Sequence, residues 1–559
     1  MSRELTIRAL AIGAALAVLL TVVNTYMGLK TGWVESGTVT ASLLGFAICS
    51  LAVRMGAAPS NPLELNIIQN VAVAAGAVST VVGLIGPIPA LQMLGRAWST
   101  PALFAWGIAL CALGVILAIR LRPRLIEGER PLRFPSGVAT AEIIRAVFRS
   151  GNDGLRRASA LGIGAAVAGL IAWLRDGSLK LIPALVPLRF PIAGVDAGNL
   201  AFGIATSPMM IGVGLLVGPA TGLGVLLGAV IAWCVIAPYL IEANLVASAD
   251  YPSLVQWLVW PAVAMMIASS VTNWLMDWRT IVSALRGSRS PAARSTLLGL
   301  VAAIAVAVLV ASQVIGVRIE AALLGFAILP LLVGVAARAA GETDVAPLGD
   351  MGTITQAVLA QPASGDPQST LAPAGAVTGV GMQTTSLLLA FKTTSILGGN
   401  RARVMIAQLV GITIGLFASI PLYQLLDSVY GIGTGEFPSP TALSWRATAE
   451  AMAGGGAALP DGAALAAAIS AGIGVALTLA GRIESLRRWA PAPAAVGIGF
   501  LVPFAYALPI ALGGFAAGAL ARKRPALAET TIMPVASGAI AGEALVALGL
   551  AVAAAASAT

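Results

Sequence analysis

The sequence contains no histidine and only three cysteines among its 559 residues. Without histidine, the chain lacks the commonest metal ligand and the side chain whose charge ordinarily changes near neutral pH. Cys49, Cys111 and Cys234 each lie alone within an apolar run, which indicates buried small side chains rather than a redox or metal centre. We therefore expect neither a metal site nor a cofactor.

Charge is also scarce. Charged residues make up 10% of the chain and apolar residues 58%, and the mean hydropathy is +0.92. Soluble domains have about 25% charged residues, so this composition excludes an ordinary soluble protein and places the chain in a lipid bilayer. The net charge of +9 comes mainly from arginines that cluster between apolar runs, as they do in cytoplasmic loops. We predict a multi-pass protein of the inner (plasma) membrane that does not bind nucleic acid.

Long apolar runs are abundant. A helix needs about 20 apolar residues to cross the hydrocarbon core. The pattern predicts an all-α polytopic integral membrane protein with about 14–16 transmembrane helices, some of them broken or re-entrant. The runs are 9–23, 33–53, 66–86, 101–119, 158–174, 198–217, 219–240, 254–273, 296–316, 319–337, 371–391, 404–425, 463–481, 494–520 and 533–556.

The arginines orient the first half of the chain. With a cytoplasmic N-terminus, the basic stretches 120–133 and 279–294 both fall on the cytoplasmic side, as the positive-inside bias requires. The second half is less regular, because Arg482, Arg487 and Arg488 fall where the same alternation predicts the outside. A segment in that region that crosses only half of the membrane would change the number of full crossings and place these arginines on the cytoplasmic side.

The sequence contains an internal duplication. Similar segments recur in the same order in both halves, which predicts two related membrane repeats, 1–279 and 280–559. Two related halves around a central site are the architecture of many secondary transporters. The matching segments are 41–48 with 321–328, 66–69 with 353–356, Phe134-Pro-Ser and 139–142 with Phe437-Pro-Ser and 447–450, and Gly203, Ile204 and Pro208 with Gly497, Ile498 and Pro503.

The first predicted hairpin carries polar side chains where lipid is expected. Asn24, Tyr26 and Lys30 precede Glu35, with glycines at 28 and 32. This pattern is compatible with an ordinary external loop that the glycines help to turn. It is also compatible with a broken helix whose exposed backbone lines a solute path, because irregular backbone at membrane depth is tolerated only there.

A second polar group begins the run after Pro62. Glu64, Asn66 and Gln69 lie there, and the duplicated segment offers Asp350 and Gln356. Carboxamides can hydrogen-bond peptide-like or carboxylate groups without carrying a fixed charge. They can equally bond to neighbouring helices, so both interpretations remain open at this point.

The segment 133–148 is too short to span the membrane and suggests a re-entrant or interfacial helix that starts at Pro135. Ser136, near its capping position, and the free N–H groups of the first turn would attract an anionic group. Glu142 can serve a site in the membrane or simply pair with Arg145, three residues later.

A further polar stretch, 375–392, follows a polar insert at 361–373 and is interpreted as a discontinuous helix. It contains Gln383 and ends on Lys392. The lysine can contact a substrate carboxylate or extend to the lipid headgroups.

Motifs of enzymes and ATP-driven pumps are missing. The sequence has no Gly-Lys-Ser/Thr phosphate loop, no paired Asp clusters for magnesium–pyrophosphate chemistry, no serine nucleophile elbow and no His-Glu-x-x-His segment. We expect a protein that is not an enzyme.

Several segments together resemble the oligopeptide transporter (OPT) family. The opening Asn24-Thr-Tyr-Met-Gly-Leu-Lys-Thr-Gly-Trp33 is similar to the start of that family, and Leu132–Glu142 is similar to its Tyr/Phe-Pro-Ser/Glu-Gly element. The Ser-Gly form is nearer to the yellow-stripe-like, metal-chelate branch and its bacterial relatives. Gly497–Pro503 extends the resemblance over nearly the whole chain.

The resemblance implies a proton-coupled symporter that imports small peptides, peptide-like siderophores or metal–chelator complexes, and a homodimer by analogy. The chain departs from the eukaryotic members in lacking their long acidic N-terminal region. It also lacks the additional motifs of the peptide-transporting branch, which makes a tetra- or pentapeptide a less expected substrate. A passive channel for small polar solutes is the alternative, because polar broken helices can also line a pore. The predicted substrate contacts are Asn24, Tyr26, Lys30, Asn66, Gln69, Ser136, Gln356, Gln383 and Lys392. Without histidine, proton coupling would use carboxylates, namely Glu35, Glu64, Glu142 and Asp350.

Overall fold

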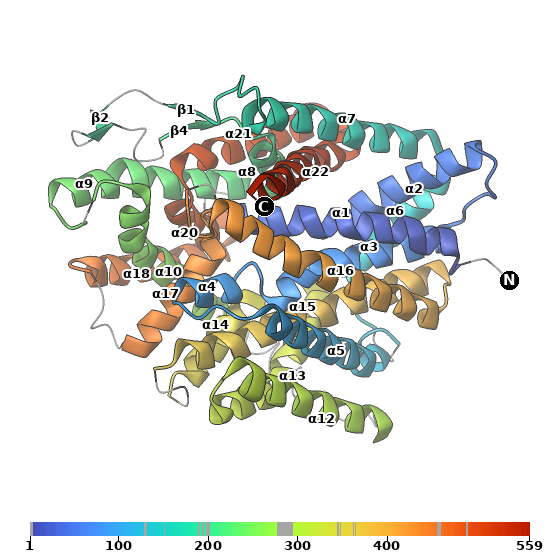
Figure 1. The fold of residues 1–559 in the computed structure, drawn as a ribbon, viewed down its shortest axis with the longest axis horizontal. Helices are drawn as coiled ribbons and strands as arrows, with labels where there is room; N and C mark the ends of the chain where they lie inside the picture. Colours follow the sequence, from blue (N-terminus) through green and yellow to red (C-terminus); the bar gives the residue numbers. More distant parts are fainter. Residues whose placement is uncertain are drawn as a thin grey trace. The chain divides into compact units, whose positions relative to one another are not determined.

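The computed structural model is an all-α membrane protein (Figure 1). It describes residues 4–558 apart from 128–130, 150, 188–190, 193–194, 197–201, 247, 277–293, 344–345, 347, 362, 364, 436, 455–459 and 488–489. Two compact units are present. Unit 1 comprises residues 1–25, 34–158 and 276–424, and unit 2 comprises 26–33, 159–275 and 425–559. Each unit draws on both halves of the sequence, so the units do not follow the boundary predicted for the repeats.

Unit 1 is built around two buried helices, α3 and α15, which pack against each other. Asn61 caps α3 by accepting hydrogen bonds from the backbone N–H groups of Leu63 and Glu64, and Pro62 fills the first helical position. In Figure 1, α15 lies beside α5 and α13. The elements of this unit are α1 (Ile7–Thr31, as far as Thr25), α2 (Thr38–Arg54), α3 (Pro62–Val82), α4 (Pro87–Met93), α5 (Thr100–Leu125), α6 (Pro135–Arg149), α12 (Arg294–Leu309), η3 (Val310–Ile315), α13 (Ile319–Thr343), α14 (Leu348–Leu359), α15 (Pro367–Leu397) and α16 (Arg401–Tyr430, as far as Gln424).

Unit 2 is centred on α8, which packs against α20, α21 and α22. Its elements are α7 (Gly151–Asp176, from Ser159), α8 (Pro208–Ala229), η2 (Val230–Ile236), α9 (Ala237–Glu242), α10 (Tyr251–Met276), α17 (Pro440–Gly454), α18 (Ala463–Ala480), α19 (Glu484–Arg487), α20 (Pro493–Leu501), α21 (Phe504–Lys523) and α22 (Pro525–Ala558). Between α7 and α8, β1 (Leu185–Pro187) pairs with β4 (Gly203–Ala205), and β2 (Pro191–Ile192) pairs with β3 (Val195–Asp196), both antiparallel.

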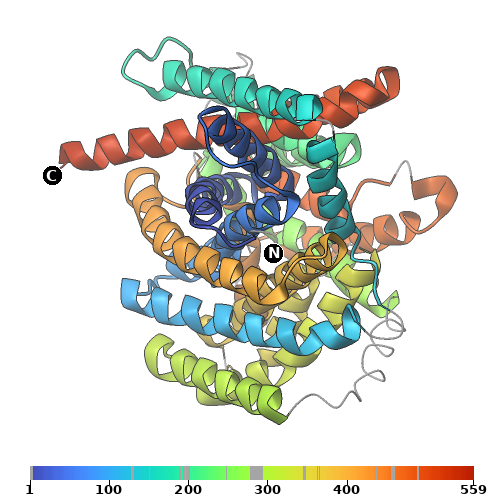
Figure 2. The same cartoon turned by 90° about the vertical axis from the view of Figure 1, so that its right-hand side faces the viewer.

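Glycines let the helices of unit 2 approach at backbone distance. A Cβ on Gly214 would lie 2.0 Å from the carbonyl oxygen of Ile510, and one on Gly513 would lie 2.2 Å from that of Ile211, so α8 and α21 interlock reciprocally. The same holds for α7 and α22, which Figure 2 shows side by side in teal and red, with Gly538 against Leu161. Small residues of this kind drive packing in lipid, where the hydrophobic effect between helices is absent.

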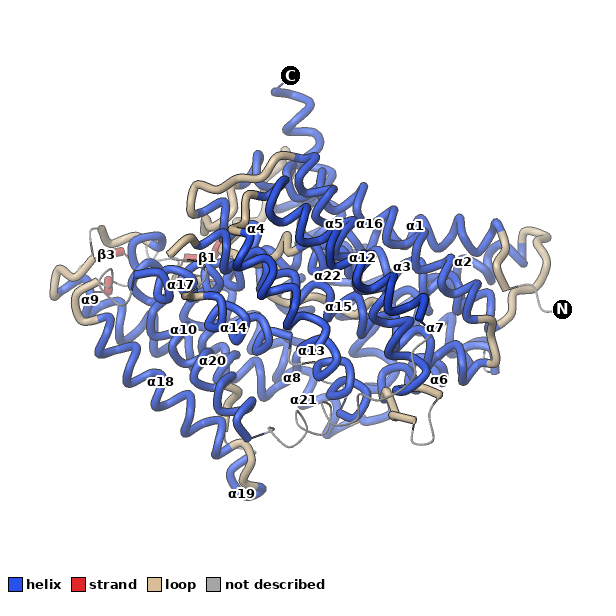
Figure 3. Tube along the Cα trace, turned by 90° about the horizontal axis from the view of Figure 1, so that it is seen from below, coloured by secondary structure: helices blue, strands red, loops and turns tan. Residues whose placement is uncertain are grey.

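Among the described residues, thirteen helices are long and apolar enough to cross a membrane. This confirms the predicted all-α polytopic membrane protein, and three of the predicted apolar runs differ in detail. The runs 198–217 and 219–240 form one element, 208–242, kinked at Gly218, and the run 33–53 becomes α2, whose 17 residues are short for a span. Breaks do occur, as predicted: α3 gives way to α4 at Gly83, and α20 ends before Pro503, where α21 begins. The helical character is plain in Figure 3.

The prediction of a discontinuous helix at 375–392 is wrong. Residues 367–397 form the single helix α15, and the polar insert supplies its start instead of interrupting it. Asp366 caps the helix, accepting hydrogen bonds from the backbone N–H and the hydroxyl of Ser369 at 3.2 and 2.6 Å. The polar residues thus stabilise the first turn, which explains why their hydrophilicity does not indicate a break.

Helices α10 and α18 run in the same direction. The indole of Trp257 near the start of α10 donates to the carbonyl of Asp461 before α18, and Arg482 after α18 donates to Asn273 near the end of α10. Arg482 therefore lies at the end of α10 that leads into the basic stretch 279–294. Arg482 thus shares the side of the basic stretch 279–294, which is the side predicted to be cytoplasmic. The alternation of spans predicts the outside for Arg482, and the parallel direction of α10 and α18 resolves this disagreement.

We expect Gly513→Ala to destabilise the protein, because the added methyl group meets the carbonyl oxygen of Ile211. Gly472→Ala, in α18, is the matched control: no atom lies within 4 Å of its Cβ position, so it should stabilise its helix by up to about 1 kcal/mol. Thermal unfolding in detergent should move in opposite directions for the two variants. Equal shifts would contradict the role assigned to close helix approach.

Candidate functional site

Unit 1 contains a cavity of about 100 Å³ that both apolar and polar residues line. Residues of α1, α2, α3, α6, α15 and α16, together with the loop after α1, form its walls. Four of the predicted site residues line it: Asn24, Glu35, Gln69 and Ser136. The other polar lining residues are Ser36, Thr38, Asn70, Thr80, Thr140, Thr385, Ser386, Thr393 and Gln408.

The loop 32–37 brings irregular backbone to this cavity. Helix α1 is continuous through Asn24 to Thr31, and the chain then turns at Gly32 and Gly37, both with positive φ. Asn24 holds the loop: its amide donates to the carbonyls of Glu35 and Gly76, both at 2.9 Å, and its oxygen accepts from the Glu35 N–H at 3.0 Å. Glu35 and Gly37 of the loop are buried and Ser36 is exposed, and Asn24 satisfies the backbone N–H and carbonyl of Glu35, as irregular backbone in a membrane requires.

Glu35 is the one ionisable side chain among the described residues that line the cavity. The residue is 8% exposed, and its Oε1 accepts a 2.5 Å hydrogen bond from the hydroxyl of Thr40. Carboxylates buried in membrane proteins are costly and usually functional. The cavity thus combines many neutral hydrogen-bonding groups with a single acid.

A chain of amides runs along one wall. Asn66 donates to the Thr394 hydroxyl, Asn70 donates to the Asn66 side-chain oxygen, and Gln408 donates to the Asn70 side-chain oxygen, each at 3.0 Å. Asn66, predicted as a substrate contact, is thus bonded to neighbouring helices behind the cavity. Its effect on the cavity is to orient Asn70, which lines it.

Several polar atoms at the cavity wall have no hydrogen-bond partner among the described residues. They are Gln69 Oε1, Thr80 Oγ1, Thr385 Oγ1 and Gln408 Oε1, each buried within the protein. Buried polar atoms are almost always paired with protein, water or ligand. These four, from α3, α15 and α16, are closed off from the cavity in this structure, and a solute or waters can bond to them only when the walls separate.

The short helix α6 begins beside the cavity, as expected for a re-entrant segment. Phe134 precedes its first proline with a φ of 49° and is fully buried, and its N–H donates to the carbonyl of Gly341. Ser136 lies in the first turn and reaches the cavity. Lys392 donates at 2.9 Å to the Leu132 carbonyl, so it anchors the segment before α6.

Tyr26 and Lys30 belong to unit 2. The Lys30 ammonium, on a residue 9% exposed, lies 5.2, 5.4 and 5.8 Å from the ring centres of Tyr26, Phe437 and Tyr506. The end of α1 is held in this frame by the Ser439 N–H, which donates to the Leu29 carbonyl at 3.0 Å. Three aromatic faces around one ammonium form a cation–π arrangement.

The remaining predicted residues do not line the described cavity. Glu64 is held by Arg8 at 2.6 Å and by the Thr6 hydroxyl, and exposed Glu142 pairs with Arg145 at 3.0 Å. Gln383 and Gln356 are buried in α15 and α14. Asp350 falls in α14, and its side chain lies outside the described residues.

Sequence reasoning missed Glu543, which is fully buried in α22. Its carboxylate accepts from the Ser207 hydroxyl at 2.8 and 2.9 Å, from the Met209 N–H at 2.9 Å and from Arg175 at 3.1 Å. It also missed Gln408 in α16. Each is the kind of lone polar side chain within an apolar run that indicated the other candidates.

We expect Asn24→Ala to lower the free energy of unfolding by about 1–3 kcal/mol, because it leaves the buried Glu35 and Gly76 backbone groups without their partner. Thr21→Val, on the same helix and equally buried, should change little, because Thr21 bonds only the carbonyl four residues before it. Detergent unfolding of both variants tests this. Similar losses would show that Asn24 does not hold the loop.

Comparison with known proteins identifies the family of the chain. The family model described as OPT oligopeptide transporter protein matches residues 4–296 and again 292–554, which fits the duplication. The chain is 23% identical to "Putative oligopeptide transporter YGL114W" of Saccharomyces cerevisiae, over 92% of this chain and 91% of that protein. It is 25% identical to "Probable metal-nicotianamine transporter YSL9" of Oryza sativa subsp. japonica, over 97% and 88%. A "Putative oligopeptide transporter" of Haemophilus influenzae is 29% identical over 46% of this chain and 36% of that protein.

The resemblance noted in the sequence is thereby confirmed. The relatives are transporters and not enzymes, and they include the metal-nicotianamine group that the Ser-Gly element indicated. Two family matches that together cover nearly the whole chain show that this protein belongs to the OPT oligopeptide transporter family.

Proposed function

We propose that this chain is a proton-coupled symporter that imports small peptide-like solutes or metal chelates across the inner (plasma) membrane, as a homodimer. The observation that carries the proposal is the set of four unpartnered polar atoms at the wall of a cavity whose one ionisable lining group is Glu35. The names of the relatives support both substrate classes, since they describe oligopeptide and metal-nicotianamine transporters.

The chemistry of the cavity suits a solute that carries its own charges and ligands. Amides and hydroxyls such as those of Gln69, Thr385 and Gln408 match the N–H and C=O groups of a peptide-like backbone. A chelated metal ion travels as cargo with its coordination filled by the chelator, so the transporter needs no metal ligands of its own. With about 100 Å³ of space, the cavity holds several waters. Entry of a larger solute therefore requires its walls to separate.

Glu35 is the proposed coupling group. Its backbone lies in a loop bounded by two glycines of positive φ, so a change at this loop moves the carboxylate relative to α3. When the cavity opens to water, the ionised form is favoured; when the cavity closes, the cost of a buried charge favours the protonated form. Each transport cycle would thus carry one proton with the solute.

We expect Glu35→Gln to abolish accumulation driven by a pH gradient in proteoliposomes, with a decrease of at least about tenfold, because the side chain can no longer release a proton. Exchange of labelled for unlabelled solute should survive, since it needs no net proton movement. Glu142→Gln is the control, because that exposed carboxylate already pairs with Arg145.

Two outcomes would contradict this proposal. Glu35→Gln protein that still accumulates solute would exclude Glu35 as the coupling group. Wild-type protein that equilibrates solute but never accumulates it would favour the passive channel.

Lys30 is proposed to bind a carboxylate of the solute, because its ammonium is buried in an aromatic frame rather than extended toward water. We expect Lys30→Gln to raise the KM for a carboxylate-bearing solute by about tenfold, and to change it much less for the amidated analogue. Lys30→Arg should retain most of the affinity. Equal effects on both solutes would assign Lys30 a purely structural role.

A further inference from the structure

We propose that unit 2 carries a specific site for one anionic phospholipid, on the face formed by α8, α10, α18 and α20. Two adjoining depressions on this face have the complementary chemistry of a lipid: one is apolar and suits an acyl chain, and the other is polar and carries an arginine. The proposal concerns a different part of the chain from the transport cavity and does not depend on the proposed substrate.

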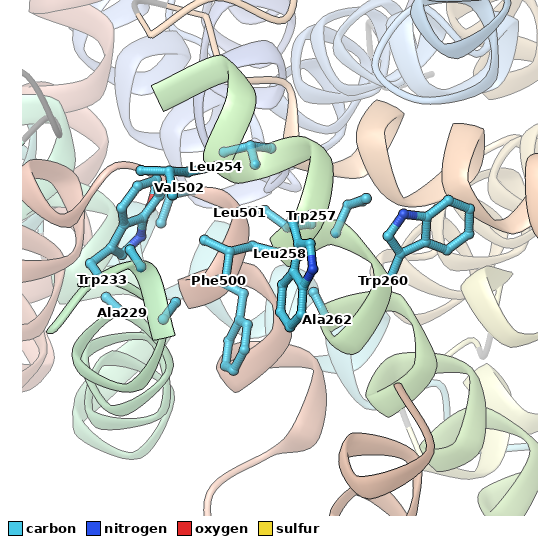
Figure 4. Close-up of a cluster of buried hydrophobic side chains, with 14 of the residues drawn as sticks. Ala229, Trp233, Leu254, Trp257, Leu258, Trp260, Ala262, Phe500, Leu501 and Val502 are labelled. Carbon is cyan, nitrogen blue, oxygen red and sulfur yellow. The ribbon is translucent and has the colours of Figure 1, made fainter. Parts of the chain in front are cut away.

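The apolar depression is a groove of about 410 Å³. Its floor belongs to the hydrophobic core of unit 2, where Figure 4 shows Phe500 between Trp233 and Trp257. Its rim is formed by Ile469 and Ile473 of α18, which are 56% and 45% exposed. An unfilled apolar groove would leave these atoms without dispersion contacts. In a bilayer, an acyl chain supplies those contacts.

The polar depression, of about 340 Å³, continues the groove, because Leu477 and Pro491 line both. Hydroxyl, amide and guanidinium groups gather here, from Thr221, Ser269, Asn273, Thr478 and Arg482. The guanidinium is held in place at 3.2 Å from the Asn273 side-chain oxygen, and Thr478 donates to Ser269 at 2.8 Å. The depression is therefore a built polar site at the end of an apolar one.

The position of Arg482 selects a lipid phosphate. The arginine follows the last residue of the apolar helix α18, Ala480, by two positions, which is the level at which headgroups meet a membrane span. Arginine binds phosphate with paired, charge-assisted hydrogen bonds. The same end of α10 leads into a basic segment and is predicted to be cytoplasmic, where anionic lipids attract arginine and lysine. Charge complementarity therefore favours an anionic phospholipid over a zwitterionic one.

Native mass spectrometry of the detergent-purified full chain tests the site. The protein is mixed with phosphatidylglycerol or with phosphatidylcholine of identical acyl chains. We expect saturable retention of one lipid per chain, with at least about fivefold preference for phosphatidylglycerol, the extra contribution coming from the arginine–phosphate contact. Arg482→Gln should reduce that preference to none. Arg522→Gln, an exposed arginine at the end of α21 away from the groove, should leave it unchanged.

A second variant tests the groove independently of charge. Ile473→Trp should fill the apolar depression and lower the retention of both lipids, while thermal unfolding confirms that the variant is folded. Equal lipid preference in the Arg482→Gln and Arg522→Gln proteins would overturn the proposal. So would retention that rises without saturation. Dissociation of an oligomer by Ile473→Trp, without any change in lipid retention, would assign the groove to a second copy of the chain and also overturn it.

Discussion

The cavity of unit 1 depends on the three hydrogen bonds of Asn24. Within a membrane, a turn of irregular backbone has no water to satisfy its N–H and C=O groups, so protein groups must do so. Asn24 satisfies both the N–H and the carbonyl of Glu35, and it ties them to α3 at Gly76. Gly76 makes room for this contact, because a Cβ there would lie 3.0 Å from the Leu20 Cβ and 3.2 Å from the Asn24 amide nitrogen. Removing this contact would release the loop and the acid that it carries.

The two units use small residues for different purposes. In unit 2, Gly214 and Gly513 bring α8 and α21 into backbone contact, and this packing replaces the hydrophobic effect as the source of cohesion. In unit 1, Gly379 of α15 and Gly411 of α16 bring these helices equally close to α3, which carries Gln69 and Asn70 into the cavity. Close packing thus fixes the positions of the polar groups, because helices at backbone distance cannot slide without collision.

The sequence predicted the membrane class, most of the spans and four of the cavity residues, because each depends on local pattern. Asn24, Glu35, Gln69 and Ser136 stood out as polar groups within or beside apolar runs, and such groups face a cavity or a partner. Local pattern cannot say which of the two. Asn66 and Glu64 are also polar residues in an apolar run, but they bond to protein partners. Asn66 bonds to Thr394 and Glu64 to Arg8, and both partners are far away in the sequence.

Other features depend on contacts that no local pattern records. The hydrophilic residues of 361–373 and 375–392 predicted a discontinuous helix, whereas Asp366 caps the continuous helix α15. Phe134-Pro135 and Ser439-Pro440 are a second case in which the local sequence pattern misleads. Both pairs begin a helix with a residue of positive φ, but the matching letters Phe-Pro-Ser align Phe134 with Phe437 instead. In the structure, Phe134 therefore corresponds to Ser439, because each has positive φ immediately before the proline that starts a helix. The matching sequence letters pair Phe134 with Phe437, two residues earlier.

Glu35 and Glu543 show why burial alone does not identify a coupling acid. Both carboxylates are buried within the protein. Glu543 accepts hydrogen bonds from a hydroxyl, a backbone N–H and a guanidinium, so its charge is compensated by rigid groups of unit 2. Protonating it would leave Arg175 with less compensation in a buried position, which is costly. Glu35 instead lies in the loop after α1 and lines a cavity, and polar atoms beside it have no partner among the described residues. The satisfied network of Glu543 suits it to hold α7, α8 and α22 together, whereas Glu35, beside the cavity, is the carboxylate proposed to exchange a proton.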